Sequence, residues 1–286
     1  MPIFTISHVT TYQYRKPVAF GEHRMMLRPR DDSDQIVLDS ELDIAPAPAE
    51  ISWERDRFGN HVATARFAKR ARELRFTSTI RLEHAPFTFR AEDIEDFART
   101  FPFAYAEDDN PYTAPLTSNA ELHHWAHGFL RDDGTAETYA LLAGMTQTIR
   151  RTFKHVARHA KGVQDPFETL TLGSGSCRDM AMLMIEALRS LGIAARFVSG
   201  YLHLNGDDDH VTGGNTHAWV QAYVPGPGWV DFDPSSGNVG NENLVRVATV
   251  HDPREAVPLS GSWIGSHSDH LAMDVFVKVA AAAPAE

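Results

Sequence analysis

The chain of 286 residues contains a single cysteine, Cys177, so no disulfide can form within it. An apolar content of 43% is sufficient for a sizeable core without such links. A lone cysteine is most often a small buried residue. A reactive thiol instead needs an electropositive, accessible setting and a histidine partner, so the residues around Cys177 have to separate the two interpretations.

Long apolar runs and an excess of positive charge are also absent. No apolar run approaches the length of a membrane span, and residues 1–10 lack the basic and apolar segments of a signal peptide. We therefore expect a cytoplasmic protein without a membrane partner. The net charge of -11 repels phosphate backbones, so nucleic acid is not an expected partner either.

Motifs for metals and cofactors are missing as well. His123 and His127 are four residues apart in an expected helix, but a zinc site needs a third ligand and an activating group. The His-Glu-x-x-His motif and a phosphate-binding glycine loop do not occur. We interpret the two histidines as part of a solvated helix face, and the sequence predicts neither a metal nor a cofactor.

Residues 1–95 are expected to form an antiparallel β domain. The sequence from Asp56 to Asn60 predicts a turn within it. Three segments alternate apolar and polar residues, as strands with one buried face do: 3–14, 36–44 and 74–82.

Residues 96–286 are expected to form an α+β core with a C-terminal strand extension. Ser118 and Glu121 have the spacing of a capping box ahead of the first helix, and Gly192 ends the third. Apolar periodicity predicts helices at 122–130, 135–153 and 177–191, and strands at 195–201, 217–224, 229–232 and 271–279. The stretch between the second and third helices is polar and contains glycine, and no element is predicted there.

Cys177 begins the predicted helix 177–191, which is apolar on most faces, as a buried central helix is. A thiol in the first turn lies at the positive end of the helix dipole, which favours the thiolate and lowers its pKa. Free backbone N–H groups at the helix start could also stabilise an oxyanion. This setting favours a nucleophile over a structural cysteine.

His217 is the expected base for this thiol, although the chain contains fifteen histidines. A glycine-containing stretch, 213–215, leads to the strand that His217 begins. Asp233 ends the partner strand and could accept the second imidazole N–H, which would fix the tautomer and the orientation of the ring. Asp231 is the competing acid, and a turn-capping role for Asp233 ahead of proline is the structural alternative.

The strand register bears on this pair. A symmetric four-residue loop at 225–228 would pair Val220 with Asp233. His217 and Asp233 would then point to opposite faces, because strand side chains alternate. A working triad therefore requires a bulge or a different loop length.

Four blocks of the sequence, taken in order, resemble the bacterial transglutaminase-like proteins, relatives of papain-type cysteine proteases. The blocks are residues 175–181, 188–201, 216–219 and 228–235. Residues 8–30 resemble the N-terminal β region that precedes such cores. The resemblance implies that Cys177 is the nucleophile, His217 the base and Asp233 its orienter. It also implies a papain-like core, in which a central helix that carries Cys177 packs on an antiparallel sheet that carries His217 and Asp233.

Arg178 departs from the family pattern, because a glutamine is more usual beside the nucleophile. The substitution removes no catalytic group and adds a positive charge next to the thiol. We therefore expect Arg178 to affect the choice of substrate.

The resemblance implies acyl transfer on a peptide or protein amide. The thiolate would attack the carbonyl carbon and form a thioester, which water hydrolyses in a cysteine peptidase or amidase. A protein-glutamine transglutaminase or deamidase would use the same residues. The alternative from another class is a binding module that keeps the fold without reacting. The sequence predicts no oligomeric state.

Overall fold

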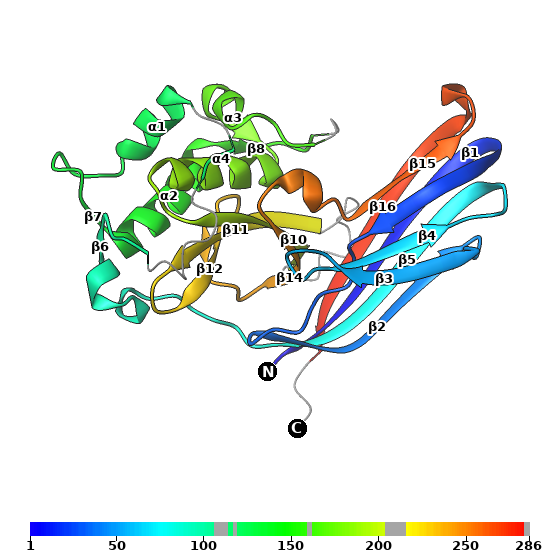
Figure 1. Ribbon diagram of the computed structural model, residues 1–286, viewed down its shortest axis with the longest axis horizontal. Helices are drawn as coiled ribbons and strands as arrows, with labels where there is room; N and C mark the ends of the chain where they lie inside the picture. The colour runs from blue at the N-terminus through cyan, green and yellow to red at the C-terminus, as the bar shows by residue number, and fades with distance from the viewer. Residues whose placement is uncertain (106–113, 117–118, 159–161, 204–215, 283–286) are drawn as a thin grey trace.

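The computed structural model describes residues 1–105, 114–116, 119–158, 162–203 and 216–282. Their main elements are a seven-stranded sheet, a five-stranded sheet and four α-helices. The five-stranded sheet lies between the helices and the seven-stranded sheet (Figure 1). One of its faces packs in a hydrophobic cluster with the helices, and the other packs in a cluster with the seven-stranded sheet.

The first sheet and its return strands have these bounds: β1 Ile3–Met25, β2 Gln35–Ala45, β3 Glu50–Arg55, β4 His61–Arg66, β5 Ala71–His84, β15 Leu259–Ile264 and β16 His270–Ala282. The second sheet contains β10 Ala195–Leu202, β11 Thr216–Val224, β12 Gly228–Asp233, β13 Asn238–Val239 and β14 Leu244–Val250. Short strand pairs are β6 Thr100–Phe101 with β7 Ala136–Glu137, and β8 Lys154–His155 with β9 Ser174–Gly175.

The α-helices are α1 Ala120–His127, α2 Thr138–Thr152, α3 Pro166–Leu172 and α4 Cys177–Ser190. Short 3-10 helices are η1 Ala91–Asp93, η2 Asp96–Ala98, η4 Pro253–Glu255 and η5 His267–Asp269.

The long strand β1 organises the seven-stranded sheet. Its first half pairs with β5 and β16, and its second half pairs with β4 and β15. The predicted strands at 3–14, 36–44 and 74–82 are confirmed as parts of β1, β2 and β5, and the predicted turn joins β3 to β4. Alternation revealed these strands because their apolar residues, such as Ile6 and Ile80, face a buried cluster while their neighbours face solvent.

The C-terminal strands return to this first sheet. The predicted strand at 271–279 is present as part of β16. Strand β16 pairs with β1 from Ile3 to Tyr14. The seven-stranded sheet thus contains both ends of the described chain. The domain limits 1–95 and 96–286 stay a prediction, to which the structure adds that residues 259–282 complete the N-terminal sheet.

Helix α4 packs against the five-stranded sheet, whose order is β13-β12-β11-β10-β14. Every residue from Asp179 to Arg189 is buried, as the apolar sequence predicted. Three charged residues lie within this buried part, and two of them form an ion pair in which Arg189 Nη1 is 2.9 Å from Glu186 Oε1. The expected α+β architecture, with a central helix that carries Cys177, is confirmed.

Two local features differ from the prediction. The first helix is capped by Asn119, whose side chain accepts hydrogen bonds from the N–H groups of Glu121 and Leu122, whereas Ser118 lies outside the described residues. Helix α3 was not predicted, although Asp165 caps its start and Gly173 ends it in the left-handed conformation. Its seven residues are too few for a clear apolar period, so only the cap signals could have revealed it.

Candidate active site

The start of α4 is fixed by the buried carboxylate of Asp179. It accepts hydrogen bonds from the backbone N–H and the hydroxyl of Ser176, at 2.9 and 2.8 Å. The backbone N–H of Gln164 and the guanidinium of Arg158 donate to the same carboxylate, at 2.6 and 2.9 Å. Asp179 therefore ties three chain segments together directly behind Cys177.

The Cys177 thiol is half-buried in the first turn of α4. Burial alone would raise its pKa, but hydrogen bonds with His155 and His217, the charge of His217 and the N–H of Ala218 lower that pKa to about 6. A thiol with this pKa is largely thiolate at neutral pH. The first helical hydrogen bond of α4 is donated by Met180 to Ser176, so the preceding N–H groups have no acceptor within the helix.

The β11–β12 hairpin has a three-residue loop, not the symmetric four-residue loop considered from the sequence. Val224 pairs with Gly228, and Val220 pairs with Phe232. The register shifts by one residue, so His217 and Asp233 come to lie on the same face of the sheet. Gly226 adopts a φ of 107°, a conformation that few other residues tolerate and that this tight loop requires.

His217 and Asp233 form a hydrogen-bonded pair. The Nε2 atom of His217 lies 2.8 Å from Oδ2 of Asp233, which is fully buried. Burial would lower the pKa of His217, but the Asp233 charge and hydrogen bond outweigh it and raise that pKa to about 10. Because Nε2 contacts Asp233, Nδ1 is the nitrogen that remains for the thiol.

Asp233 is held ionised by several donors. Burial would raise its pKa, but His217 and the hydroxyls of Ser236 and Ser235 lower that pKa to about 2. The Ser235 hydroxyl donates to Oδ1 at 2.8 Å, and the Ser236 hydroxyl donates to Oδ2 at 2.6 Å. Asp233 therefore has both of the roles that the sequence suggested. Its carboxylate contacts the imidazole of His217, and it also caps the turn that follows the strand.

Asp231 does not contact His217. It accepts a hydrogen bond from the indole Nε1 of Trp219 at 2.5 Å and lies near the guanidinium of Arg246. The fully buried Trp219 ring stacks beside His217 and forms part of its support. Of the two acids considered from the sequence, the structure brings Asp233 to the imidazole.

His155 is a neighbour of the thiol that the sequence did not reveal. It lies in β8, where it pairs with Gly175 two residues before Cys177. A hydrogen bond with Cys177 raises the pKa of His155. Nothing in the local sequence distinguishes His155 from the other histidines, because its strand has only two residues and forms by pairing with a distant segment.

Three further predictions from the sequence concern the glycine-containing stretch, a metal site and a membrane span. The stretch 213–215 lies outside the described residues. His123 and His127 lie close together on α1, and among the residues that the structure describes no cluster of His, Cys, Asp and Glu could hold a metal ion. None of the described helices combines the length and the apolar character needed to cross a membrane.

Two family models match the chain, and a solved structure shares its fold. A model of the bacterial transglutaminase-like N-terminal region matches residues 4–83, and a model of the transglutaminase-like superfamily matches residues 132–234. The solved structure of a proposed cysteine protease from Cytophaga hutchinsonii superposes with a TM-score of 0.75 at 22% identity. It covers 100% of this chain and 92% of that one, which shows the same fold.

Relatives of similar length occur in mycobacteria. An uncharacterized protein of Mycobacterium tuberculosis is 28% identical over 295 residues, which cover 96% of this chain and 92% of that protein. A protein-glutamine gamma-glutamyltransferase of Pseudomonas aeruginosa is 36% identical over 110 residues, or 35% of this chain and 16% of that protein. The chain belongs to the transglutaminase-like superfamily and carries the bacterial transglutaminase-like N-terminal region.

Proposed function

We propose that this protein is a cysteine peptidase or amidase with Cys177 as nucleophile, His217 as general acid and base, and Asp233 as the residue that orients the imidazole. One observation carries the proposal: the half-buried thiol lies at a helix start and is hydrogen-bonded to an imidazole that a buried carboxylate holds. A structural cysteine requires neither partner.

The reaction begins from a thiolate and an imidazolium, because the pKa of Cys177 lies below that of His217. The thiolate attacks the carbonyl carbon of the amide, and N–H groups at the start of α4 stabilise the oxyanion. His217 gives its proton to the leaving amine, and a thioester remains on Cys177. Water then attacks the thioester while His217 accepts a proton, which releases the carboxylic acid and restores the Cys177 thiolate and the His217 imidazolium.

Transfer to a second amine, or deamidation of glutamine, is the alternative function. These reactions use the same thioester and differ only in the group that attacks it. The local similarity to a protein-glutamine gamma-glutamyltransferase supports this alternative over one third of the chain. A non-catalytic binding module is disfavoured, because such a module has no need of a thiol with a lowered pKa.

The test is the rate of iodoacetamide modification as a function of pH. Cys177 is the only thiol, so mass spectrometry reports on it alone. We expect reactivity that persists down to about pH 6 in the wild type and is lost at this pH in His217→Ala. The exposed His124 on α1 offers the matched control His124→Ala. A profile like that of a free cysteine, with a pKa of about 8.5, would sink the proposal.

A further inference from the structure

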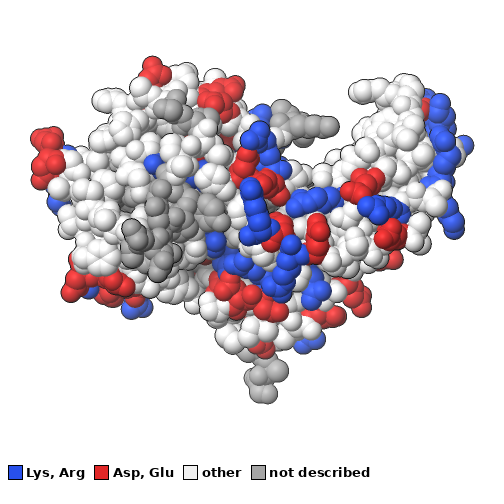
Figure 2. Space-filling model, in the orientation of Figure 1, with Lys and Arg blue, Asp and Glu red and all other residues white. Residues whose placement is uncertain are grey.

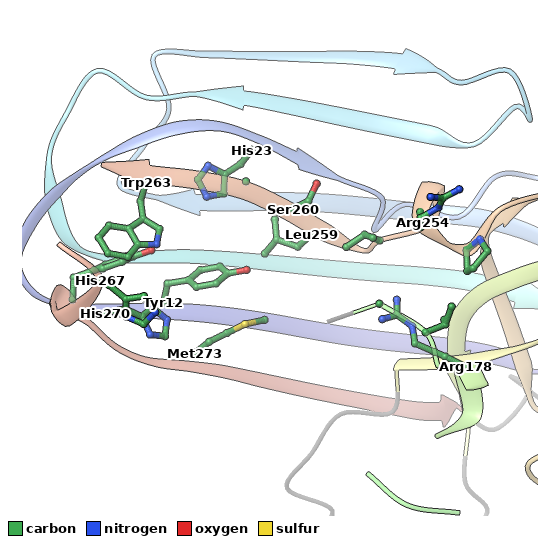
Figure 3. Close-up of a pocket in the computed structure, with 16 residues that line it drawn as sticks. Tyr12, His23, Arg178, Arg254, Leu259, Ser260, Trp263, His267, His270 and Met273 are labelled. Carbon is green, nitrogen blue, oxygen red and sulfur yellow. The ribbon is translucent and has the colours of Figure 1, made fainter. Parts of the chain in front are cut away.

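A cavity of about 830 Å³ lies between the seven-stranded sheet and the start of α4. Strands β1, β15 and β16 provide one wall, and Arg178 and Val163 belong to the opposite one. Figure 2 shows the molecule hollowed between the helical part and the large sheet. In Figure 3, Arg178 projects from α4, while Tyr12, Trp263 and Met273 lie on the strands across from it.

The lining is cationic in a protein whose net charge is -11. Arg178 and Arg254 line the cavity, and its described lining includes neither Asp nor Glu. Arg254 is paired with Asp252. Arg178 is half-buried and makes neither an ion pair nor a hydrogen bond with the part of the chain that the structure describes, so its guanidinium is available to a ligand.

The strand wall is aromatic and apolar. Trp263 packs against Tyr14 with ring centroids 5.1 Å apart, and Met273 leaves 51% of its surface exposed. His23 lies directly over Gly261, where an added Cβ would be 2.2 Å from the ring. Burial lowers the pKa of His23, so its imidazole is neutral near pH 7 and belongs to the apolar wall. Such a surface favours aromatic or aliphatic groups of a ligand.

The position of the cavity relates it to the proposed reaction. Arg178 follows Cys177 directly in the first turn of α4, so the cavity begins one residue along the chain from the thiol, and Cys177 itself is not among the residues that line it. The other wall belongs to the N-terminal sheet, which has no part in the Cys177–His217–Asp233 site. A substrate that filled the cavity would contact both parts of the molecule.

We propose that this cavity binds the acyl-donor substrate, and that the preferred substrate is a peptide with an acidic side chain on Arg178 and aromatic or apolar side chains on the Tyr12, Trp263 and Met273 wall. This inference rests on the proposed function of the thiol. It assigns the N-terminal sheet to substrate binding and Arg178 to specificity, since a guanidinium and a carboxylate form a strong charge-assisted hydrogen bond.

The test measures peptide binding by fluorescence anisotropy in the background Cys177→Ala, which cannot turn over. The probes are two fluorescein-labelled amidated pentapeptides, Glu-Tyr-Glu-Tyr-Glu and Gln-Tyr-Gln-Tyr-Gln. We expect the acidic peptide to bind about tenfold more tightly, which corresponds to one charge-assisted contact of about 1.4 kcal/mol. Equal affinities, or no binding of the acidic peptide at 1 mM, would overturn the inference.

Two variants locate the contact. Arg178→Gln should reduce the preference for the acidic peptide to less than about twofold, while Arg151→Gln, an exposed change of equal charge on α2, should leave it intact. Met273→Glu removes an apolar contact and places a carboxylate at an exposed position of the cavity, where it should weaken the acidic peptide more than the neutral one. A preference that survives both cavity variants would place the peptide elsewhere and refute the assignment.

This binding assay does not depend on a reactive thiol, so the two proposals fail separately. If Cys177 does not react with iodoacetamide but the protein still binds the acidic peptide more tightly than the neutral one, only the proposed function is refuted. A reactive thiol without that preference would refute only the assignment of the cavity.

Discussion

The Nε2 atom of His217 lies 2.8 Å from Oδ2 of Asp233, and a hairpin with a loop of only three residues brings them together. One more residue in that loop would shift the register by one and turn the two side chains to opposite faces of the sheet. The contact therefore depends on register, and it shapes the ionisation of the whole site.

Replacement of Asp233 by Asn should weaken the site without removing a reacting group. The imidazolium loses its buried counter-charge, so the pKa of His217 falls and that of Cys177 rises. We expect amide hydrolysis to fall by about 10²- to 10⁴-fold, as for other orienting carboxylates. Asp231→Asn is the matched control two residues away, and it should keep most of the activity. Similar losses in both variants would contradict the assigned roles.

The pH dependence of the reaction should follow the two shifted groups. The thiolate forms as pH rises through the Cys177 pKa of about 6, and the imidazolium is lost as pH rises through the His217 pKa of about 10. We expect a bell-shaped profile of kcat/KM with limbs near these values. A profile that rises only above pH 8 would show that no ion pair exists in the free enzyme.

His155 should tune the thiol without acting as its base. Replacement of His155 by Phe removes one hydrogen bond to the thiolate, so the pKa of Cys177 should rise while the His217–Asp233 pair stays intact. The measurement is the pH profile of iodoacetamide modification. We expect its midpoint to move toward higher pH, with partial activity kept. A profile equal to that of the wild type would remove His155 from the site.

Asp179 should matter for stability as well as for the placement of Cys177. Asp179→Ala leaves Arg158 and the N–H of Gln164 without their acceptor, which should lower the free energy of unfolding by about 3 kcal/mol. Urea denaturation measures this loss. Thr171→Ala, an exposed change on the neighbouring helix α3, is the control and should cost much less.

The same carboxylate predicts how stability depends on pH. Burial would raise the pKa of Asp179, but its hydrogen bonds with Gln164 and Ser176 lower it below the unfolded-state value of about 3.9. Its contribution is therefore present above that value and is lost as pH falls through the folded-state pKa. Wild type and Asp179→Ala should become more alike in stability as the solution is acidified, and a constant difference would contradict this.

The sequence by itself indicated the elements with a strong local pattern. Alternation identified β1, β2 and β5, and apolar periodicity identified α4 with Cys177 at its first position. These features follow from short-range rules, because one buried face imposes a period of two or 3.6 residues on the chain. Resemblance to a family then singled out His217 and Asp233 among many histidines and acids.

Tertiary structure decided what depends on pairing between distant segments. The loop length that aligns His217 with Asp233, the two-residue strand that brings His155 to the thiol and the return of β16 to β1 are long-range contacts. Their free energy comes from partners far along the chain, which leave no local period. The cavity beside Arg178 exists for the same reason, since its two walls belong to segments that only the fold brings together.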